Sequence, residues 1–497
     1  MDRSRLFRMA FYLLLIIAIR VQLFHDFPLL LTADSWDFLH AAKAIAERLD
    51  FSDAKIIGLR DCRVPGYPIF QATWLPFTCL RSDRILLVQA ALGLAGVLIG
   101  WGLGRTLRSP RTGEMLAVFL GINPIGLIYE HSMMSEGLCL VMLLAFTLVA
   151  LPGLREGPSI GRGVLIGIMS GTSVLVRINV APFVATLIVG IILARKRGDS
   201  KTSQRREAAK FVLACGLASA LIIGPWIFRN YNLYHKISLN MFQTRALLLY
   251  KSFHHPLVNK LPEMRQVNAS LGKGGVSYDW LWELTNRHGT VAAEEIAGRL
   301  LREQWKKHPG RHLMEMAQSV VCFGGLYESS LDDRSPMRYW FEHLVCDVSA
   351  VNRLYSDSES LGDRLGLRYM SAPGDTVSTR AWAAIGRWYL LVFRPVLSIA
   401  FVGSLISRRF RRRLGAVPSH RDSAVRWLSL GYLATVAFHA ATLTDSDRFS
   451  SLYDWVPFMV VVLVAESGFS GPGPVASTTC PQDSTNRTEV GPFAASV

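Results

Sequence analysis

Charged residues are scarce in this chain of 497 residues, making up 19% of it against 50% for the hydrophobic types. An ordinary soluble domain carries about 25% charged residues, so this composition excludes one. Nucleotide-binding patterns are missing too. Residues 229–387 hold no P-loop, no GxGxxG, no paired CxxC and no βαβ alternation, so a nucleotide-dependent site is unsupported there.

What the sequence does contain is a series of apolar runs of membrane-spanning length. A helix needs roughly 20 apolar residues to cross the hydrocarbon core, and about ten segments qualify as candidate spans. They are 7–24, 85–104, 115–129, 137–151, 164–176, 180–194, 211–228, 388–406, 427–443 and 456–465. The sequence therefore predicts an all-α polytopic membrane protein.

The basic residues predict the orientation of these spans. The net charge is +16, but clusters such as "RKRGDSKTSQRR" and "RRFRRR" fall in every second loop. This is the positive-inside pattern, so the charge indicates topology and no nucleic-acid partner. Both termini are then cytoplasmic. No small-residue cleavage site follows the first span, which we interpret as a retained anchor and not as a signal peptide.

The loops without basic clusters are predicted to lie on the extracytoplasmic side of the membrane, and two of them are too long to be simple turns. Four regions follow: a transmembrane catalytic module 1–228 with a first outer loop 25–84, an extracytoplasmic loop domain 229–387 with amphipathic helices broken at Pro309, C-terminal transmembrane helices 388–466, and a disordered tail 467–497. Cys62 and Cys79 share the first outer loop, and Cys322 and Cys346 share the long one. Each pair is open to two interpretations, a disulfide or two unrelated free thiols.

The first outer loop begins with two carboxylates three residues apart, in "LTADSWDFLHAAKAI". Apolar residues recur there at helical spacing, which predicts an amphipathic helix at the membrane interface. A charge beside hydrocarbon is costly unless it is used or paired. Asp34 is open to two interpretations, a helix N-cap or a functional carboxylate. Asp37 is likewise either a solvated or paired residue or a functional one.

Further polar candidates lie at the predicted outer boundary. "RVPGYPIF" places Arg63 and Tyr67 around a predicted rigid turn, and "YEHSMMSEG" places His131 and Glu136 between two spans. His131 and Glu136 are each open to two interpretations, a metal ligand or an ordinary polar residue at the membrane boundary. Arginines occur at other predicted span ends, where snorkelling is the plain alternative to function. They are Arg177, Arg229 and Arg448, with Arg20 as a weaker member.

Carboxylates and guanidinium groups on an outer face fit the transfer of a sugar from a lipid-linked phosphate to a hydroxyl group. The acceptor oxygen needs a general base, which a carboxylate provides. The departing phosphate needs cations, and the arginine fork matches its oxygens. A polyprenyl-phosphate-linked donor would enter laterally from the bilayer. The acceptor, an envelope glycolipid, glycan or protein, is not specified by these residues.

The same residues carry a resemblance. "TADSWDFLHAAKAI", "RVPGYPIF", "HSMMSEGL", "LVRIN", "PWIFRNYN", "KKHPGRHL" and "DRFSSLYDWVPF" occur in an order that resembles the GT-C membrane glycosyltransferases, specifically the protein-mannosyltransferase-like family 39 group that includes the lipid A aminoarabinose transferases. The resemblance implies a GT-C-like helical bundle, an inverting single displacement, and Asp34 as catalytic base. Many relatives carry a second acid at the next position, where this chain has Ser35. Asp37 is then the partner of Asp34 or a metal ligand, and whether a divalent metal ion is bound stays open.

Within the resemblance, the phosphate or pyrophosphate contacts fall to Arg63, Arg177, Arg229 and Arg448, with Tyr67, His131 and Glu136 as further substrate-binding candidates. A secondary transporter or a flippase of lipid-linked substrates is the main alternative, because many spans with buried charges suit it. Transporters of that kind tend to show repeated halves and charges at mid-membrane, and no internal repeat is evident here.

Overall fold

The computed structural model describes residues 3–26, 33–48, 64–79, 81–107, 110–194, 201–239, 279–323, 377–406, 420–441 and 451–469. Every regular element in these ranges is a helix, and none of them is a β-strand. The all-α prediction is confirmed for this part of the chain. Arg63, Arg448 and the tail from residue 470 lie outside the described residues, as do the side chains of Asp34 and Asp37.

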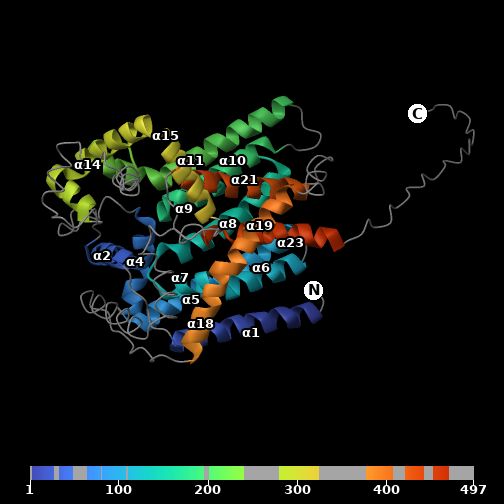
Figure 1. Ribbon diagram of the computed structural model, residues 1–497. Coiled ribbons are helices and arrows are strands. Elements are labelled where there is room, and N and C mark those ends of the chain that lie inside the picture. Colours follow the sequence, from blue (N-terminus) through green and yellow to red (C-terminus); the bar gives the residue numbers. More distant parts are fainter. Residues whose placement is uncertain are drawn as a thin grey trace, which may run out of the picture.

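Figure 1 shows how the described helices are arranged. Their bounds are α1 Arg3–Asp26, α2 Ala33–Arg48, α4 Gly66–Thr78, α5 Ser82–Leu107, α6 Pro110–Ile122, α7 Pro124–His131, α8 Ser135–Glu156, α9 Ile160–Val176, η1 Ile178–Val180, α10 Ala181–Leu193, α11 Lys201–Tyr234, α14 Asp279–Lys307, α15 Pro309–Phe323, α18 Val377–Trp388, η3 Tyr389–Phe393, α19 Arg394–Ile406, α21 His420–Ala441, η4 Ser451–Tyr453 and α23 Trp455–Phe469.

Five of the described helices are long and apolar enough to cross a membrane. They lie at Leu6–His25, Asp83–Leu107, Ser135–Glu156, Thr202–Tyr234 and Ala384–Ile406. The pair α6 and α7, bent by 49°, makes a sixth if it is one span. All ten predicted segments overlap helices, but α9, α10, α21 and α23 fall short on length or composition. By this criterion the described residues do not reach the predicted count of about ten.

The two ends of the bundle differ in content. Figure 1 shows the start of α1 and the end of α23 at one end, while α2, α4 and α14 lie at the other. α8 is the most enclosed of the five single-helix spans, with 50% of its apolar window buried against 22–33% for the others.

Small residues bring α9 and α11 into close contact. A Cβ atom built on Gly163 would lie 2.8 Å from the carbonyl oxygen of Phe211, and Gly167 is crowded in the same way by Cys215. Membrane helices approach closely through such small-residue faces, because van der Waals contact replaces the hydrophobic effect in lipid. α9 and α11 run in the same direction, so the C-terminus of α9 lies at the level of the last turns of α11.

Two local predictions have different outcomes. The break at Pro309 is confirmed, since α14 ends at Lys307 and α15 begins at Pro309. The predicted rigid turn at "VPGYP" is wrong, because α4 begins at Gly66 with Pro68 in its first turn, where proline costs no hydrogen bond. Gly66 is required there, since a Cβ atom would lie 2.7 Å from the backbone of Leu175.

Candidate functional site: buried charges at one end of the helical bundle

The helix that carries the two aspartates packs against α4. Ser35, Phe38, Leu39 and Ala42 of α2 are buried at i, i+3, i+4 and i+7, which is one face of a helix. α4 lies on that face. Asp34 and Asp37 occupy the first two turns of α2. The amphipathic helix predicted from this stretch is confirmed, and its N-terminal turns carry both carboxylates.

Tyr67 links this helix to the rest of the site. Its ring meets that of Phe38 edge to face, with 4.9 Å between the centroids, and the side chain is 2% exposed. Burial and the nearby Glu136 carboxylate raise the pKa of the Tyr67 hydroxyl well above its usual value. The side chain therefore stays a neutral phenol, which can donate one hydrogen bond but cannot serve as a base at physiological pH.

Glu136 and Arg177 form a buried ion pair close to Tyr67. Arg177 Nη1 lies 2.8 Å from Glu136 Oε1 and donates to the Ser135 hydroxyl at 2.9 Å. Glu136 is fully buried in the first turn of α8, where the helix dipole favours an anion, and Arg177 follows the last residue of α9. Two sequence-predicted residues thus meet, and we call Tyr67, Glu136 and Arg177 the outer cluster.

Arg229 and His131 lie elsewhere. Arg229 is half-buried near the end of α11, stacks over the ring of Trp226 at 4.5 Å and donates to Asn230 Oδ1 at 3.0 Å. α11 continues past the predicted span end at residue 228, so Arg229 is a helical residue. His131 ends α7, with its Nδ1 2.9 Å from the carbonyl oxygen of Leu127. These contacts are made with residues other than Tyr67, Glu136 and Arg177.

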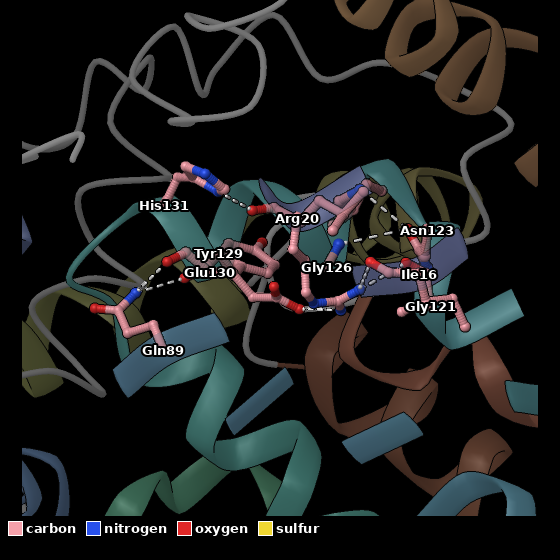
Figure 2. A network of polar contacts seen from close by, with 11 residues as sticks. Ile16, Arg20, Gln89, Gly121, Asn123, Gly126, Tyr129, Glu130 and His131 are labelled. Atoms are coloured by element: carbon pink, nitrogen blue, oxygen red, sulfur yellow. Dashed lines mark hydrogen bonds and ion pairs between the residues drawn. The ribbon is translucent and has the colours of Figure 1, made fainter. Parts of the chain in front are cut away.

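A second buried network surrounds the bend between α6 and α7 (Figure 2). Arg20 Nη2 lies 2.6 Å from Glu130 Oε1, and the two side chains are 5% and 6% exposed. Arg20 also donates to the carbonyl oxygen of Gly121 at 3.1 Å, in the last turn of α6. A broken helix leaves such carbonyl groups without intrahelical partners, and in lipid each needs another donor.

Two amides complete the hydrogen bonding at this bend. The side chain of Asn123 caps α7 by accepting from the Ile125 amide at 3.0 Å. Gln89 Nε2 contacts the carbonyl oxygens of Tyr129, Glu130 and Ser132 at 2.7 to 3.1 Å, where α7 ends. Polar side chains from α1 and α5 therefore make an irregular backbone segment tolerable inside the bundle.

A third ion pair ties the C-terminal helices to this network. Arg394 Nε donates to Asp454 Oδ1 at 3.2 Å, and the Tyr389 hydroxyl donates to the other oxygen at 3.0 Å. Asn123 in turn donates to the Tyr389 oxygen at 3.2 Å. Sequence reasoning passed over Glu130, Arg394 and Asp454. The sequence signal for these residues was a charge within or beside an apolar run. Such a charge indicates that a partner exists but does not show which residue the partner is.

No candidate metal centre is found among the described residues. Within those ranges, no three side chains of the His, Cys, Asp and Glu types come together. Asp34 and Asp37 are not covered by this statement, because their side chains are not described. Cys79 is a free thiol, so the structure does not contain the disulfide alternative of Cys62 with Cys79.

A half-open hollow with a volume of about 20 Å³, room for about one water molecule, lies between α4 and α5. It is lined by Tyr67, Phe70, Gln71, Trp74, Leu75, Thr78, Ile85, Val88, Gln89 and Met133. The α4 residues lie at helical spacing, so one face of α4 forms one wall. Gln71 is 4% exposed, and its side chain lies within hydrogen-bonding reach of the Tyr67 hydroxyl.

Comparisons with known proteins give little support for a family. No family model matches the chain, and no curated protein matches it. Among solved structures it is similar to the crystal structure of ArnT from Cupriavidus metallidurans bound to undecaprenyl phosphate, with 13% sequence identity and a TM-score of 0.34, over 86% of this chain and 77% of that one. A likeness at this TM-score does not establish a shared fold.

Fold and site together define a class. By helix length and composition the chain is an all-helical, multi-pass membrane protein. Its described part holds three buried ion pairs, contributed by α1 with α7, by α8 with the residue after α9, and by α19 with the residue before α23. The GT-C arrangement and family 39 remain predictions from the sequence.

Proposed function

We propose that the chain is an integral-membrane glycosyltransferase. It moves a sugar from a polyprenyl-phosphate-linked donor to a hydroxyl group of an envelope glycolipid, glycan or protein, on the extracytoplasmic face of the inner membrane. The observation that carries the proposal is the packing of α2, the helix of Asp34 and Asp37, on Tyr67 beside the Glu136–Arg177 pair. That packing supports one shared site for the acidic and the basic motifs.

The reaction is a single displacement with inversion at the anomeric carbon. Asp34 accepts the proton of the acceptor hydroxyl as its oxygen forms the new glycosidic bond. The bond between the anomeric carbon and the phosphate oxygen breaks, and the phosphate leaves with the electron pair. Guanidinium groups stabilise that anion, and we assign this role to Arg63, Arg229 and Arg448. Arg177 would have to share its guanidinium with Glu136.

The remaining candidates take supporting roles in this proposal. Asp37 orients Asp34 or holds a divalent metal ion with it, since carboxylate oxygens suit such ions. Tyr67 donates a hydrogen bond to a substrate. The first 228 residues form the catalytic module, region 229–387 stands outside the membrane, and both termini are cytoplasmic.

The experiment is deletion in the source organism, followed by mass spectrometry of its envelope glycolipids and glycans. A missing mass of one sugar would name both sugar and acceptor. Complementation with wild type and with Glu47→Gln, an exposed carboxylate at the far end of α2, should restore that mass. Asp34→Asn should not restore it, although the protein accumulates in the membrane. Normal glycosylation with Asp34→Asn would remove Asp34 from the catalytic role.

Donor contacts have their own measurement. Arg63→Ala and Arg229→Ala should raise the KM for the lipid-linked donor more than the KM for the acceptor, because only the donor carries the phosphate. Titration of each substrate against the purified variants in detergent gives the comparison. Equal changes in both values would point to a folding defect.

A secondary transporter or flippase has one observation in its favour. The bend between α6 and α7 lies inside the bundle beside a buried ion pair, and discontinuous helices with buried charges occur in transporters. In proteoliposomes a flippase would move the intact lipid-linked sugar to the opposite leaflet, whereas the transferase would separate sugar from lipid. Analysis of the lipid by mass spectrometry distinguishes the two.

A further inference from the structure

Helix α15 is anchored inside the bundle by its last residue. Phe323 is 1% exposed, and its ring lies 5.9 Å from the ring of Tyr432 and 5.1 Å from that of His439, both on α21. The carbonyl oxygen of Phe323 accepts a hydrogen bond from Arg394 Nη2 at 3.1 Å. Arg394 lies near the middle of the candidate span Ala384–Ile406. The C-terminal end of α15 therefore lies at the depth of the hydrocarbon core.

The bundle covers one side of α15 and leaves an apolar side exposed. The covered side packs on α21. The exposed side carries Leu313, Met314, Val320 and Val321, which are 60%, 59%, 44% and 38% exposed. Their spacing of i, i+1, i+7 and i+8 places them along one side of the helix, and we call them the apolar stripe of α15. Val320 and Val321 lie within one turn of Phe323, so the stripe begins at hydrocarbon depth.

Basic side chains lie just before the other end of the stripe. Arg302, Lys306 and Lys307 are exposed in the last two turns of α14, and we call them the basic group. Within the described ranges, none of the three forms an ion pair. Arg302 and Lys306 are four residues apart, a spacing at which like charges repel each other. The neighbouring Glu303 is exposed and offsets only part of this charge, so the basic group suits an anion.

The length of α15 fits the path from the hydrocarbon core to the lipid head groups. Its 15 residues extend over roughly 22 Å, whereas half of the hydrocarbon core measures about 15 Å. α15 is oblique to α1, and α14 lies at the end of the bundle that also holds α2 and α4 (Figure 1). The basic group can therefore lie at head-group level while the stripe lies beside the acyl chains. Trp305, 44% exposed in α14, is a residue type enriched at that boundary.

We propose that an anionic phospholipid of the bilayer binds along α15, with its acyl chains on the apolar stripe and its phosphate at the basic group. The depth of Val320 and Val321 favours lipid over a protein that arrives from the aqueous phase. Within the extracytoplasmic loop domain proposed above, α15 is then the part that enters the bilayer. The basic group is separate from the arginines assigned to the sugar donor, and the proposal does not depend on sugar transfer.

The test is photo-crosslinking of the full chain in phosphatidylcholine nanodiscs that contain a trace of one diazirine lipid. The two probes are phosphatidylglycerol and phosphatidylcholine with the same chains and the diazirine in one of them, so that only the head group differs. Labelling of the α15 peptide is divided by labelling of the α1 peptide, where the exposed Leu14 provides an internal standard. This ratio should be about fivefold or more higher for phosphatidylglycerol, because each lysine near an anionic surface favours binding by about that factor.

Lys306→Gln combined with Lys307→Gln removes two charges from exposed positions at similar side-chain volume. The ratios for the two probes should then differ by less than about twofold, because Arg302 alone remains to attract the phosphate. The matched control is Lys43→Gln, an exposed lysine of α2, which should leave the preference for phosphatidylglycerol unchanged. Salt gives a second measurement on the wild-type chain, because about 1 M NaCl should screen the attraction and remove most of the preference.

Three results would overturn the proposal. The first is an equal ratio for both probes at low salt, and the second is a preference that survives both high salt and the double lysine variant. The third is an α15 peptide that neither probe labels while the α1 peptide is labelled. That last result would mean that protein, such as a second copy of this chain, covers the apolar stripe.

Discussion

The ion pair between Arg20 and Glu130 should be worth far more than a second ion pair made by the same helix α1. Both Arg20 and Glu130 are almost fully buried, and Arg20 also serves the carbonyl group of Gly121 at the bend. Arg8 and Glu114 also connect α1 to α6, but their closest atoms are 3.5 Å apart and Arg8 is 43% exposed. The two pairs therefore form a matched comparison.

The magnitude follows from what each variant leaves behind. Arg20→Met leaves the Glu130 carboxylate buried with no cation and removes a donor from Gly121, so the free energy of unfolding should fall by about 3–5 kcal/mol. Uptake of a proton by the carboxyl group limits the loss to the lower part of that range. Arg8→Met removes only a solvent-screened pair and should cost less than about 1 kcal/mol.

A double variant separates the two causes of the loss. Glu130→Leu alone leaves the Arg20 guanidinium buried and unpaired, and should cost about 3–5 kcal/mol as well. Arg20→Met with Glu130→Leu leaves no buried charge, so its cost should be about 1–2 kcal/mol, mainly for the Gly121 carbonyl group. The sum of the two single losses should thus exceed the loss in the double variant by several kcal/mol.

The assay is unfolding by sodium dodecyl sulfate in mixed micelles, followed by tryptophan fluorescence. Each variant is compared with wild type at the same detergent composition. The reasoning is refuted if Arg20→Met and Arg8→Met cost the same, or if the double variant costs as much as the sum of its single variants. Either result would mean that water hydrates the buried pair, or that Arg20 and Glu130 each find another partner when one of them is replaced.

Three further predictions concern glycine packing and a buried phenol. Gly93→Ala should lower the free energy of unfolding by about 2 kcal/mol or more, because a Cβ atom would overlap the Glu130 carboxylate. Added to Glu130→Ser, which itself leaves Arg20 unpaired, Gly93→Ala should cost much less than it does in the wild type, and equal costs in the two backgrounds would contradict the assignment. Gly163→Val should separate α9 from α11 at a similar cost in the same assay, whereas Gly161→Val, which meets nothing within 4 Å, should cost less than about 1 kcal/mol. Burial keeps the Tyr67 hydroxyl protonated in the folded chain above pH 10, where the unfolded chain loses that proton, so the free energy of unfolding should fall as the pH rises above 10. Tyr67→Phe should reduce the slope of this fall by up to about 1.4 kcal/mol per pH unit. An unchanged slope in Tyr67→Phe would contradict the prediction.

The helical character of the chain was predictable, because it depends on local composition. Apolar runs and a proline-marked break at Pro309 located the helices, and the spacing of Phe38 and Ala42 identified the buried face of α2. The ends of α9 and α10 were predictable too, since these helices end at Val176 and Leu193, within one residue of the ends of the predicted segments 164–176 and 180–194. Crossing length was less predictable, because both helices are shorter than a full membrane span.

The candidate site was predictable only in part. The sequence singled out Tyr67, Glu136 and Arg177, which meet in the structure, but it also singled out Arg229, which has different neighbours. It overlooked Glu130 and the pairing of Arg394 with Asp454. A lone charge in an apolar run indicates that a partner exists. In the pairs Arg20–Glu130 and Arg394–Asp454, that partner lies 110 and 60 residues away along the chain.

The sequence alone determined that this chain is a helical membrane protein, since transfer free energies act on each segment separately. Only the tertiary structure decided which charges neutralise one another. Ion pairing depends on distances of a few ångströms between helices, and those distances follow from glycine contacts and from the bend between α6 and α7.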